Sequence, residues 1–371
     1  MESNKKVLIS GASFAGLTMA YWMNKTGYHV TVVEIGPELK KGGTPVDIKG
    51  LSVEIVKRMG LFAEIKKMRI GPEKWEFKNA NDQTGFSFVL RQPGEELPDD
   101  EFEIERDSLL NMIYGKIKTD VALKFNTSII ALNETQDNIE VFFKDGSKDD
   151  YAFVFGCDGI HSAVRKIWFG EESEFAHFLG QYFSIAVVDK LLVDNGTYQM
   201  YSEPDKGAAL YAHNNKTDVI FTFRTENEIS YDFRKQEKLK EIVFLQMEGM
   251  GWRTAELRNE LLNSTSFYFD KFCQIKMQSW TKGRVALVGD AGYCASPAAG
   301  MGGSLAIIGA TALADAFIVF QDDYHSAFHS YNTGLRPLVE KIQAEAVQTL
   351  DRLLPKDEQE VKEMWGNGIS F

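Results

Sequence analysis

A short apolar run near the start of the chain leads directly into a glycine-rich turn. Residues 7–9 are Val-Leu-Ile, and residues 11–16 read Gly-Ala-Ser-Phe-Ala-Gly. A continuous apolar run of this length is typical of a strand buried on both faces of a parallel sheet. A helical pattern over 15–25 and a second strand over 29–34 follow. The chain is therefore predicted to open with a strand–helix–strand unit, which requires a parallel sheet covered by helices.

The composition of this turn predicts dinucleotide binding. A pyrophosphate needs backbone N–H groups at a helix N-terminus and no bulky side chain in the turn. Gly11 supplies the tight turn, Gly16 the close helix–strand contact, and Ser13 is small enough for the backbone to approach the phosphates. Glu34, at the end of the second strand, can accept hydrogen bonds from ribose hydroxyls. The simpler alternative is an ordinary strand–helix turn that is rich in glycine.

A second motif lies near the other end of the chain. The apolar strand expected over 284–289 is followed by Asp290, and a glycine-rich stretch over 297–303 precedes a long apolar helix. A carboxylate at a strand end can bind a ribityl or ribose hydroxyl, and the positive end of a helix suits the negative charge of a reduced flavin. Taken alone, this pattern also fits a structural strand–loop–helix corner.

Two further positions are ambiguous on their own. Asp158-Gly159 follows an apolar strand and is a common turn. Arg106 starts a predicted helix, where it is either a surface cation or a phosphate ligand.

Taken together and in order, these motifs resemble those of one family. They are similar to those of the single-component FAD-dependent monooxygenases with the para-hydroxybenzoate hydroxylase-like fold, and most similar to the tetracycline-inactivating branch. The resemblance covers nearly the whole chain. Two departures stand out, because Gly292-Tyr293-Cys294 replaces a frequent histidine and Ser304 replaces a usual asparagine.

The resemblance implies FAD as cofactor, NAD(P)H as co-substrate and a set of cofactor-binding residues. The AMP half and the general cofactor contacts would be made by Gly11, Ser13, Gly16, Glu34 and Arg106. Asp158 would serve the joint FAD and NAD(P)H region, and Gly289 and Asp290 would serve the ribityl–pyrophosphate region. The isoalloxazine would lie near Pro297, Gly300, Gly302 and Gly303. Asp47 would belong to the loop over 41–47, which faces the flavin's reactive edge.

The same resemblance implies a monooxygenase reaction. NAD(P)H would reduce FAD, O₂ would add at the flavin C4a, and the hydroperoxide would hydroxylate an aromatic or polycyclic, tetracycline-like small molecule. The flavin would carry the chemistry, so no catalytic side chain is assigned. Two alternatives remain open: an FAD-dependent dehydrogenase or reductase on the same fold, and a flavin-binding protein without turnover.

The fold class expected is α/β, with a Rossmann-like FAD-binding domain, an inserted and mostly antiparallel substrate domain, and a C-terminal helix. The FAD-binding domain is expected over 1–67, 98–172 and 280–320, the substrate domain over 68–97 and 173–279, and a helical segment over 321–371.

Local patterns give further expectations. One strand is expected over 151–155 after a hairpin turn at Asp145-Gly146, and the last helix over 339–354. Five aromatic residues of the middle region are candidates for the substrate pocket, although most are expected in the core: Tyr198, Tyr201, Tyr211, Phe221 and Phe223.

Composition limits the classes of molecule that the protein is expected to bind. The chain has 371 residues and a net charge of −12, which disfavours nucleic acid and anionic lipid surfaces. Three separated cysteines favour a reducing cytoplasm over a disulfide framework or a metal site.

The apolar stretch over 298–320 contains Asp315 and is read as a buried helix rather than a membrane span. The protein is expected to be a monomer or dimer. His325 and His329 have a metal-compatible spacing but no further ligand cluster, so a helix face is favoured.

Overall fold

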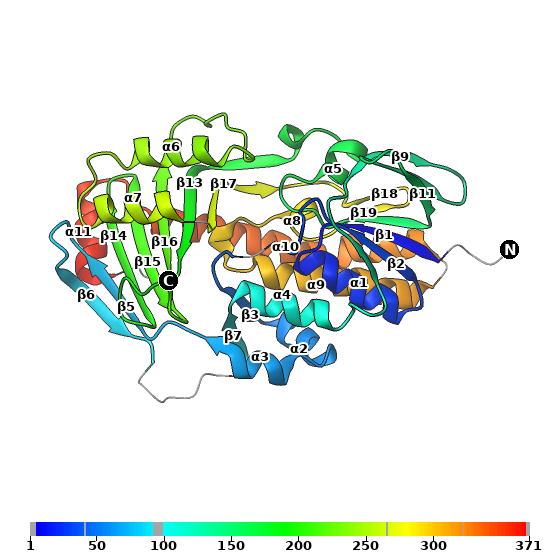
Figure 1. Cartoon of the computed structure of the whole chain (residues 1–371), viewed down its shortest axis with the longest axis horizontal. Coiled ribbons are helices and arrows are strands. Elements are labelled where there is room, and N and C mark those ends of the chain that lie inside the picture. Colours follow the sequence, from blue (N-terminus) through cyan, green and yellow to red (C-terminus); the bar gives the residue numbers. More distant parts are fainter. Residues whose placement is uncertain (1–4, 41, 92–98, 265, 322, 369–371) are drawn as a thin grey trace.

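The computed structural model describes residues 5–40, 42–91, 99–264, 266–321 and 323–368. Two large sheets lie side by side along the long axis of the molecule, with a smaller sheet and its helices between them on one side (Figure 1). The first sheet carries the N-terminal segments and the second carries most of the middle of the chain.

The first sheet has six strands in the order β18-β19-β12-β1-β2-β8. All neighbours pair in parallel except β18 and β19. The three central strands β1, β12 and β19 consist mostly of fully buried apolar residues, which explains why they appear as continuous apolar runs. Its strands are β1 (Lys6–Ser10), β2 (His29–Val33), β8 (Ala122–Lys124), β12 (Phe153–Gly156), β18 (Thr281–Lys282) and β19 (Val285–Leu287).

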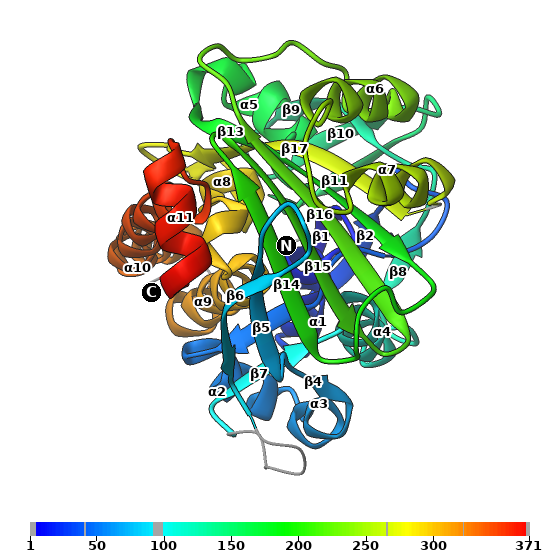
Figure 2. The same cartoon turned by 90° about the vertical axis from the view of Figure 1, so that its left-hand side faces the viewer.

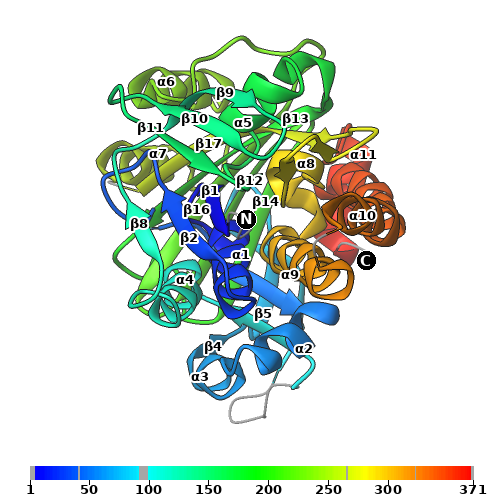
Figure 3. The same ribbon diagram turned by 90° about the vertical axis from the view of Figure 1, so that its right-hand side faces the viewer.

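Helices and a small sheet cover the two faces of this parallel sheet (Figure 3). The helices α1 (Phe14–Lys25), α9 (Gly302–Phe320) and α10 (Tyr324–Leu353) pack together on one face. A three-stranded antiparallel sheet lies on the other face, with α5 (Ala163–Trp168) beside it. Its strands are β9 (Ile129–Glu134), β10 (Ile139–Phe143) and β11 (Lys148–Tyr151).

The second sheet has seven strands in the order β17-β13-β16-β15-β14-β5-β6. Neighbours are antiparallel except β14 and β5, so the prediction of a mostly antiparallel sheet is confirmed. The helices α6 (Gln236–Gln246) and α7 (Thr254–Asn263) cover one face, and α11 (Glu358–Asn367) packs beside β6 (Figure 2). Its strands are β5 (Lys74–Lys78), β6 (Thr84–Val89), β13 (Ala176–Val188), β14 (Thr197–Glu203), β15 (Lys206–His213), β16 (Lys216–Arg224) and β17 (Ser266–Ile275).

A third, three-stranded sheet connects the two halves on one side (Figure 1). It is formed by β3 (Val46–Lys49), β7 (Glu101–Ile104) and β4 (Arg69–Ile70). The helices beside it are α2 (Leu51–Arg58), α3 (Phe62–Met68) and α4 (Arg106–Gly115). The remaining short elements are α8 (Asp290–Tyr293) and the 3₁₀ turns Glu172–Glu174 and Pro297–Ala299.

Helix α9 is long and apolar enough to cross a membrane, but 67% of its most apolar window is buried inside the protein. It packs against α1, α2 and α10, and its Asp315 forms a two-fold hydrogen-bonded ion pair with Arg58 of α2. Its apolar character therefore matches its position in the core, as expected for the stretch over 298–320.

Two expectations about local structure were wrong. The strand expected over 151–155 is two strands in different sheets, because Tyr151 pairs with Ile139 while Phe153 pairs with Val7. Every residue from 151 to 155 is apolar and buried, so periodicity carries no sign of the change of partner. The helix expected over 339–354 is the second half of α10, which continues through Pro337, and it is followed by α11.

Candidate functional site

The glycine-rich turn after β1 can be built only with glycine at its first position. Gly11 has a φ of +99°, and its N–H donates to the Val33 carbonyl of β2 at 2.8 Å. A β-carbon at this position would lie 2.5 Å from the Cys157 carbonyl oxygen at the end of β12. The turn is therefore held tightly between the ends of β2 and β12, and α1 begins three residues later at Phe14.

Glu34 holds this turn through both of its carboxylate oxygens. Oε2 accepts a hydrogen bond from the Ala12 N–H at 2.9 Å, and Oε1 accepts one from the Gly36 N–H at 2.9 Å. Each carboxylate oxygen has further acceptor capacity, and the side chain is only half-buried. Glu34 can thus support the turn and accept hydroxyl hydrogens from a ligand at the same time.

Arg106 reaches the same turn from the first position of α4. Its Nη2 donates to Ser13 Oγ at 3.2 Å and its Nη1 donates to the Lys40 carbonyl at 2.7 Å. Burial lowers the pKa of its guanidinium, which still stays charged at neutral pH. No acidic residue occupies the first turn of α1. The structure therefore brings a cation to the positive end of a helix, an arrangement that favours a phosphate ligand.

The second motif meets the first through Gly289. A β-carbon on Gly289 would lie 3.2 Å from the β-carbon of Ala15, so the turn after β19 packs against the start of α1. Asp290, the next residue, is exposed to solvent. Even so, desolvation by the surrounding protein raises the pKa of its carboxyl group, and the charge of Asp270 adds to this rise. Asp290 is thus reachable from solvent at a position where the surrounding protein disfavours its charge.

The loop over 42–47 lies beside the stretch that leads into α9. Ser304 Oγ donates to the Asp47 carbonyl at 2.7 Å. A β-carbon on Gly300 would lie 3.4 Å from Asp47 Oδ2, and one on Gly303 would lie 3.4 Å from the Val46 side chain. Gly300 adopts a left-handed conformation and Gly302 is the first residue of α9. Pro297 starts the 3₁₀ turn before it, and Lys41 lies outside the described residues.

Asp158 is occupied by the protein itself. Its Oδ2 accepts hydrogen bonds from Ser10 Oγ at 3.3 Å and from the Val164 N–H at 3.1 Å, while Ser162 donates to Oδ1. Burial raises the pKa of this carboxyl group. These contacts tie the end of β1 to the start of α5, so the Asp158 side chain has a bracing role in the fold.

Two residues near the site belong to none of the sequence motifs described above. Lys40 Nζ lies 4.7 Å from the centre of the Tyr268 ring, and desolvation together with the charge of Arg106 lowers the pKa of this lysine. Tyr268 donates to Asp270 Oδ2 at 2.7 Å. Both belong to the same region as Arg106 and Asp290, and only the tertiary fold brings them there.

Asp270 also contacts the parallel sheet's connection to α5. His161 lies between two carboxylates, with Nδ1 3.0 Å from Glu172 and Nε2 3.3 Å from Asp270. Burial lowers the pKa of His161, but its contacts with the carboxylates of Asp270 and Glu172 outweigh burial and raise the pKa to about 9. The ring stacks on Phe233 at 4.4 Å. This cluster holds the two halves of the molecule together beside the candidate site.

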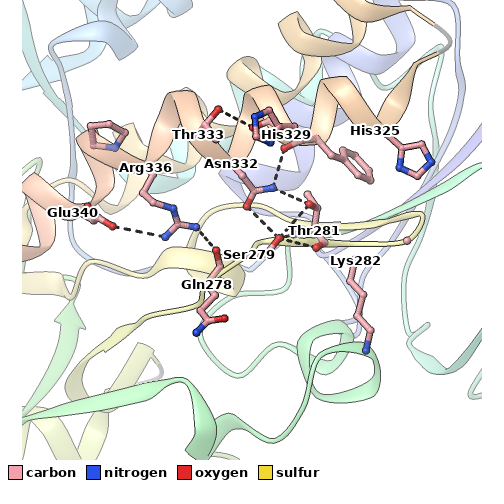
Figure 4. A pocket seen from close by; sticks show the side chains of 13 residues that line it. Gln278, Ser279, Thr281, Lys282, His325, His329, Asn332, Thr333, Arg336 and Glu340 are labelled. Carbon is pink, nitrogen blue, oxygen red and sulfur yellow. Dashed lines mark hydrogen bonds and ion pairs between the residues drawn. The ribbon is translucent and has the colours of Figure 1, made fainter.

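A surface groove of about 670 Å³ lies elsewhere, between α10 and the segment around β18 (Figure 4). None of the predicted cofactor residues lines it. His325 and His329 line the groove, but in the part of the chain that the structure describes no group of three His, Cys, Asp or Glu side chains is placed to hold a metal. Arg336 and Asn332 use their polar groups to hold the backbone of residues 277–280. The groove therefore does not take part in the candidate site.

Comparison with known proteins gives the same family. The FAD binding domain family matches residues 4–346. A flavin-dependent monooxygenase of Legionella longbeachae serogroup 1 (strain NSW150) is 35% identical over 381 residues, which cover 100% of this chain and 95% of the relative.

Two solved structures are also similar over nearly their full length. The tetracycline destructase Tet(51) superposes with a TM-score of 0.87 at 32% identity, covering 98% of this chain and 95% of its own. The tetracycline destructase Tet(55) gives a TM-score of 0.85 at 30% identity, covering 100% and 99%. The chain belongs to the FAD binding domain family and is an FAD-dependent monooxygenase.

Proposed function

We propose that this monooxygenase uses NAD(P)H and O₂ to hydroxylate an aromatic or polycyclic, tetracycline-like molecule bound between FAD and the seven-stranded sheet. The observation that carries this proposal is the division of aromatic side chains between the two faces of that sheet. The similarity to two tetracycline destructases supports a polycyclic substrate.

One face of the seven-stranded sheet is core. Tyr201, Phe221 and Phe223 belong to the buried cluster that contains side chains of α6 and α7. Strand alternation places Tyr198 and Tyr211 on the opposite face. The five candidate aromatics therefore divide into three that serve the core and two that lie on the opposite face, to which we assign the substrate.

The opposite face carries a row of stacked rings. Trp75 of β5 stacks on Tyr198 with ring centres 4.3 Å apart and planes 12° apart, and on Phe88 at 5.9 Å. Tyr211 follows Tyr198 at 5.7 Å. We call Phe88, Trp75, Tyr198 and Tyr211 the aromatic row. Flat apolar rings of this kind suit a planar polycyclic ligand.

Two more side chains on the same face lie beside the turn that precedes α9. Tyr268 of β17 lies directly opposite Ile185 of β13. Both pack in a small cluster with Ala298, which lies in the turn before α9. A ligand on this face would thus lie next to the residues assigned to the isoalloxazine.

The residues present fit FAD. Only glycine can form the turn at Gly11, and Arg106 and the N-terminus of α1 offer positive charge to a pyrophosphate. Glu34 would bind the ribose and Asp290 the ribityl chain, with Pro297, Gly300, Gly302 and Gly303 beside the ring. The 19-residue helix α9 has no acidic residue in its first turn, so its positive end would stabilise a reduced flavin. FAD, when bound, supplies the redox chemistry that activates O₂. The chain positions the substrate and excludes water.

The assignment of residues 68–97 and 173–279 to substrate binding follows from the same placement, although residues 92–98 lie outside the described part. Asp158-Gly159 is assigned to the joint FAD and NAD(P)H region through its backbone, because its side chain is already occupied. A cytoplasmic monomer or dimer fits the three free, buried cysteines and the net charge of −12.

The test is to purify the protein, record its visible spectrum and follow NADH and NADPH oxidation with phenols and tetracyclines. Stimulation by one ligand class, matched by oxygen uptake and a product heavier by one oxygen atom, is expected. Substrate-dependent oxidation of NAD(P)H without oxygen uptake would favour a dehydrogenase or reductase instead. A folded protein that does not bind FAD would contradict the assignment altogether.

A further inference from the structure

Glu103 of β7 lies between the loop over 42–47 and the aromatic row. We propose that Glu103 accepts the proton of an acidic phenol or enol hydroxyl on the substrate, so that the enzyme selects substrates that carry such a group. This inference rests on the proposed function, because it places the substrate on the aromatic face of the seven-stranded sheet.

On one side, Glu103 faces the loop assigned to the flavin. Glu103 is directly opposite Asp47 in the antiparallel pair of β7 and β3. Directly opposed residues point to the same face, with β-carbons about 5 Å apart. Asp47 Oδ2 in turn lies 3.4 Å from the position of a β-carbon on Gly300. The carboxyl group of Asp47, with Glu103 opposite it, therefore lies near the N-terminus of α9.

On the other side, Glu103 contacts the aromatic row. The Tyr211 hydroxyl donates to Glu103 Oε2 at 2.7 Å. Among the described residues, Oε1 of Glu103 has no hydrogen-bond partner. One oxygen is thus fixed by the sheet while the other remains available to a ligand.

A buried carboxyl group with one unpartnered oxygen gives a second, independent observation. Asp218 lies directly opposite Tyr211 on β16 and is fully buried, and its Oδ1 lies 3.3 Å from Nε2 of His213. Nδ1 of His213 faces Glu105 Oε1 at 3.7 Å, whereas Asp218 Oδ2 has no hydrogen-bond partner among the described residues. Buried polar groups are normally satisfied, so polar atoms of a bound ligand are expected at this end of the aromatic row.

The surroundings suit Glu103 to exchange protons near neutral pH. Burial raises the pKa of its carboxyl group most, and the charges of Asp47 and Asp218 add to the rise. The Tyr211 hydrogen bond and His213 oppose it, and the resulting value is about 7. The remaining opposed residue, Ile70 of β4, is uncharged. A base with such a pKa can be ionised and still hold a proton taken from an acidic hydroxyl.

The proton step balances within the site. The substrate O–H bond breaks, the proton moves to Glu103 Oε1, and the electron pair stays on the substrate oxygen. The substrate becomes an anion and Glu103 becomes neutral, so the net charge of the pocket does not change. An electron-rich phenolate or enolate is a better nucleophile at carbon, as insertion of an electrophilic oxygen requires.

The test compares ligands that differ only in this proton. Naphthols and hydroxyanthraquinones, each paired with its methyl ether, are titrated into the FAD-loaded enzyme between pH 5.5 and 9, with the flavin absorption spectrum reporting binding. The wild type is expected to bind the hydroxyl member at least about tenfold more tightly above pH 7, a difference of about 1.4 kcal/mol. The preference should fade as pH falls through 7, where Glu103 becomes protonated.

Two variants identify the residue responsible. Glu103→Gln should abolish the preference and its pH dependence while retaining FAD, because glutamine can still accept from Tyr211. Glu101→Gln is the matched control, since Glu101 lies on the same face of β7 and is exposed. Should Glu103→Gln fail to fold, Tyr211→Phe replaces it. Loss of that hydrogen bond should move the midpoint of the wild-type profile to higher pH.

Several outcomes would overturn the assignment. These are equal binding of hydroxyl and ether ligands by the wild type, a preference that survives in Glu103→Gln, or an unmoved midpoint in Tyr211→Phe. A site that recognises a cation instead would bind an amine-bearing ligand equally tightly whether its oxygen is a hydroxyl or a methyl ether. Absence of NAD(P)H oxidation and oxygen uptake in the wild type would instead reject the proposed function.

Discussion

The carbonyl oxygen of Gly11 lies 1.9 Å from the position that a β-carbon would occupy on residue 16. The glycine-rich turn thus folds back onto the first turn of α1, and the contact is between backbone and backbone. No side-chain movement can relieve a clash of this kind. Gly16 is therefore required by the geometry of the turn, independently of any ligand.

Gly16→Ala is expected to destabilise the protein by about 3 kcal/mol or more and to abolish FAD retention, because the turn must open to admit the methyl group. The control is Gly334→Ala in the exposed part of α10, where nothing lies within 4 Å of the added β-carbon. Relative to wild type, that variant should gain up to about 1 kcal/mol from helix propensity. Urea unfolding and the ratio of flavin to protein absorbance measure both effects. Normal FAD content in Gly16→Ala would show that the turn tolerates the change.

Arg106→Met is expected to weaken FAD binding roughly 10- to 100-fold, the range for loss of a hydrogen bond from a charged group. The stem of methionine keeps most of the packing, so the fold should survive. Arg58→Met is the control, because Arg58 forms an exposed ion pair with Asp315 away from the turn. Titration of the apoprotein with FAD, followed by flavin fluorescence, gives the dissociation constants. If both variants bind FAD equally well, Arg106 is a structural residue only.

The parts of the fold that the sequence predicted correctly are local. The Gly11 turn and the strands beside it follow from backbone constraints within about 30 residues. The strand break at Ala152 was missed because both sheets bury that segment, so apolar spacing does not change at the point where the chain leaves one sheet for another. The continuation of α10 through Pro337 depends on packing along the whole helix, which overrides the local effect of proline.

The candidate site divides in the same way. Turn residues such as Gly11 carry their chemistry in their own sequence neighbourhood. Glu103 and Tyr211 are 108 residues apart, and neither is unusual in its local context. The acidity of Glu103 depends on burial and on opposed carboxyl groups from other strands. Such properties arise only after the sheets have formed, so no local sequence motif could predict them.

His161 should make the free energy of unfolding fall as the pH becomes alkaline. Its pKa is about 9 in the folded protein, against about 6.5 in an unfolded chain. Protonated His161 therefore stabilises the fold fully below pH 6.5, by at most on the order of 3 kcal/mol, and this contribution is lost as pH rises through 9. The melting temperature of His161→Gln should fall below wild type at pH 6 and approach it near pH 10. His325→Gln, an exposed histidine on α10, should show no such trend.

Glu103 should change stability with pH in the same direction but over a lower pH range, because burial disfavours its charged form. Its pKa of about 7 exceeds the value of about 4.3 expected in the unfolded chain, so between these values the folded state holds the extra proton. Stability is then lost as pH rises through this window, by at most on the order of 3 kcal/mol. Glu103→Gln removes the charge, so its melting temperature should match wild type near pH 4.5 and exceed it at pH 8, whereas Glu101→Gln should follow wild type throughout. An equal melting temperature at pH 8 would mean that Glu103 is solvated in the folded protein. A higher one, together with loss of the hydroxyl preference, would mean that the protein gives up stability to keep an ionisable base beside its substrate.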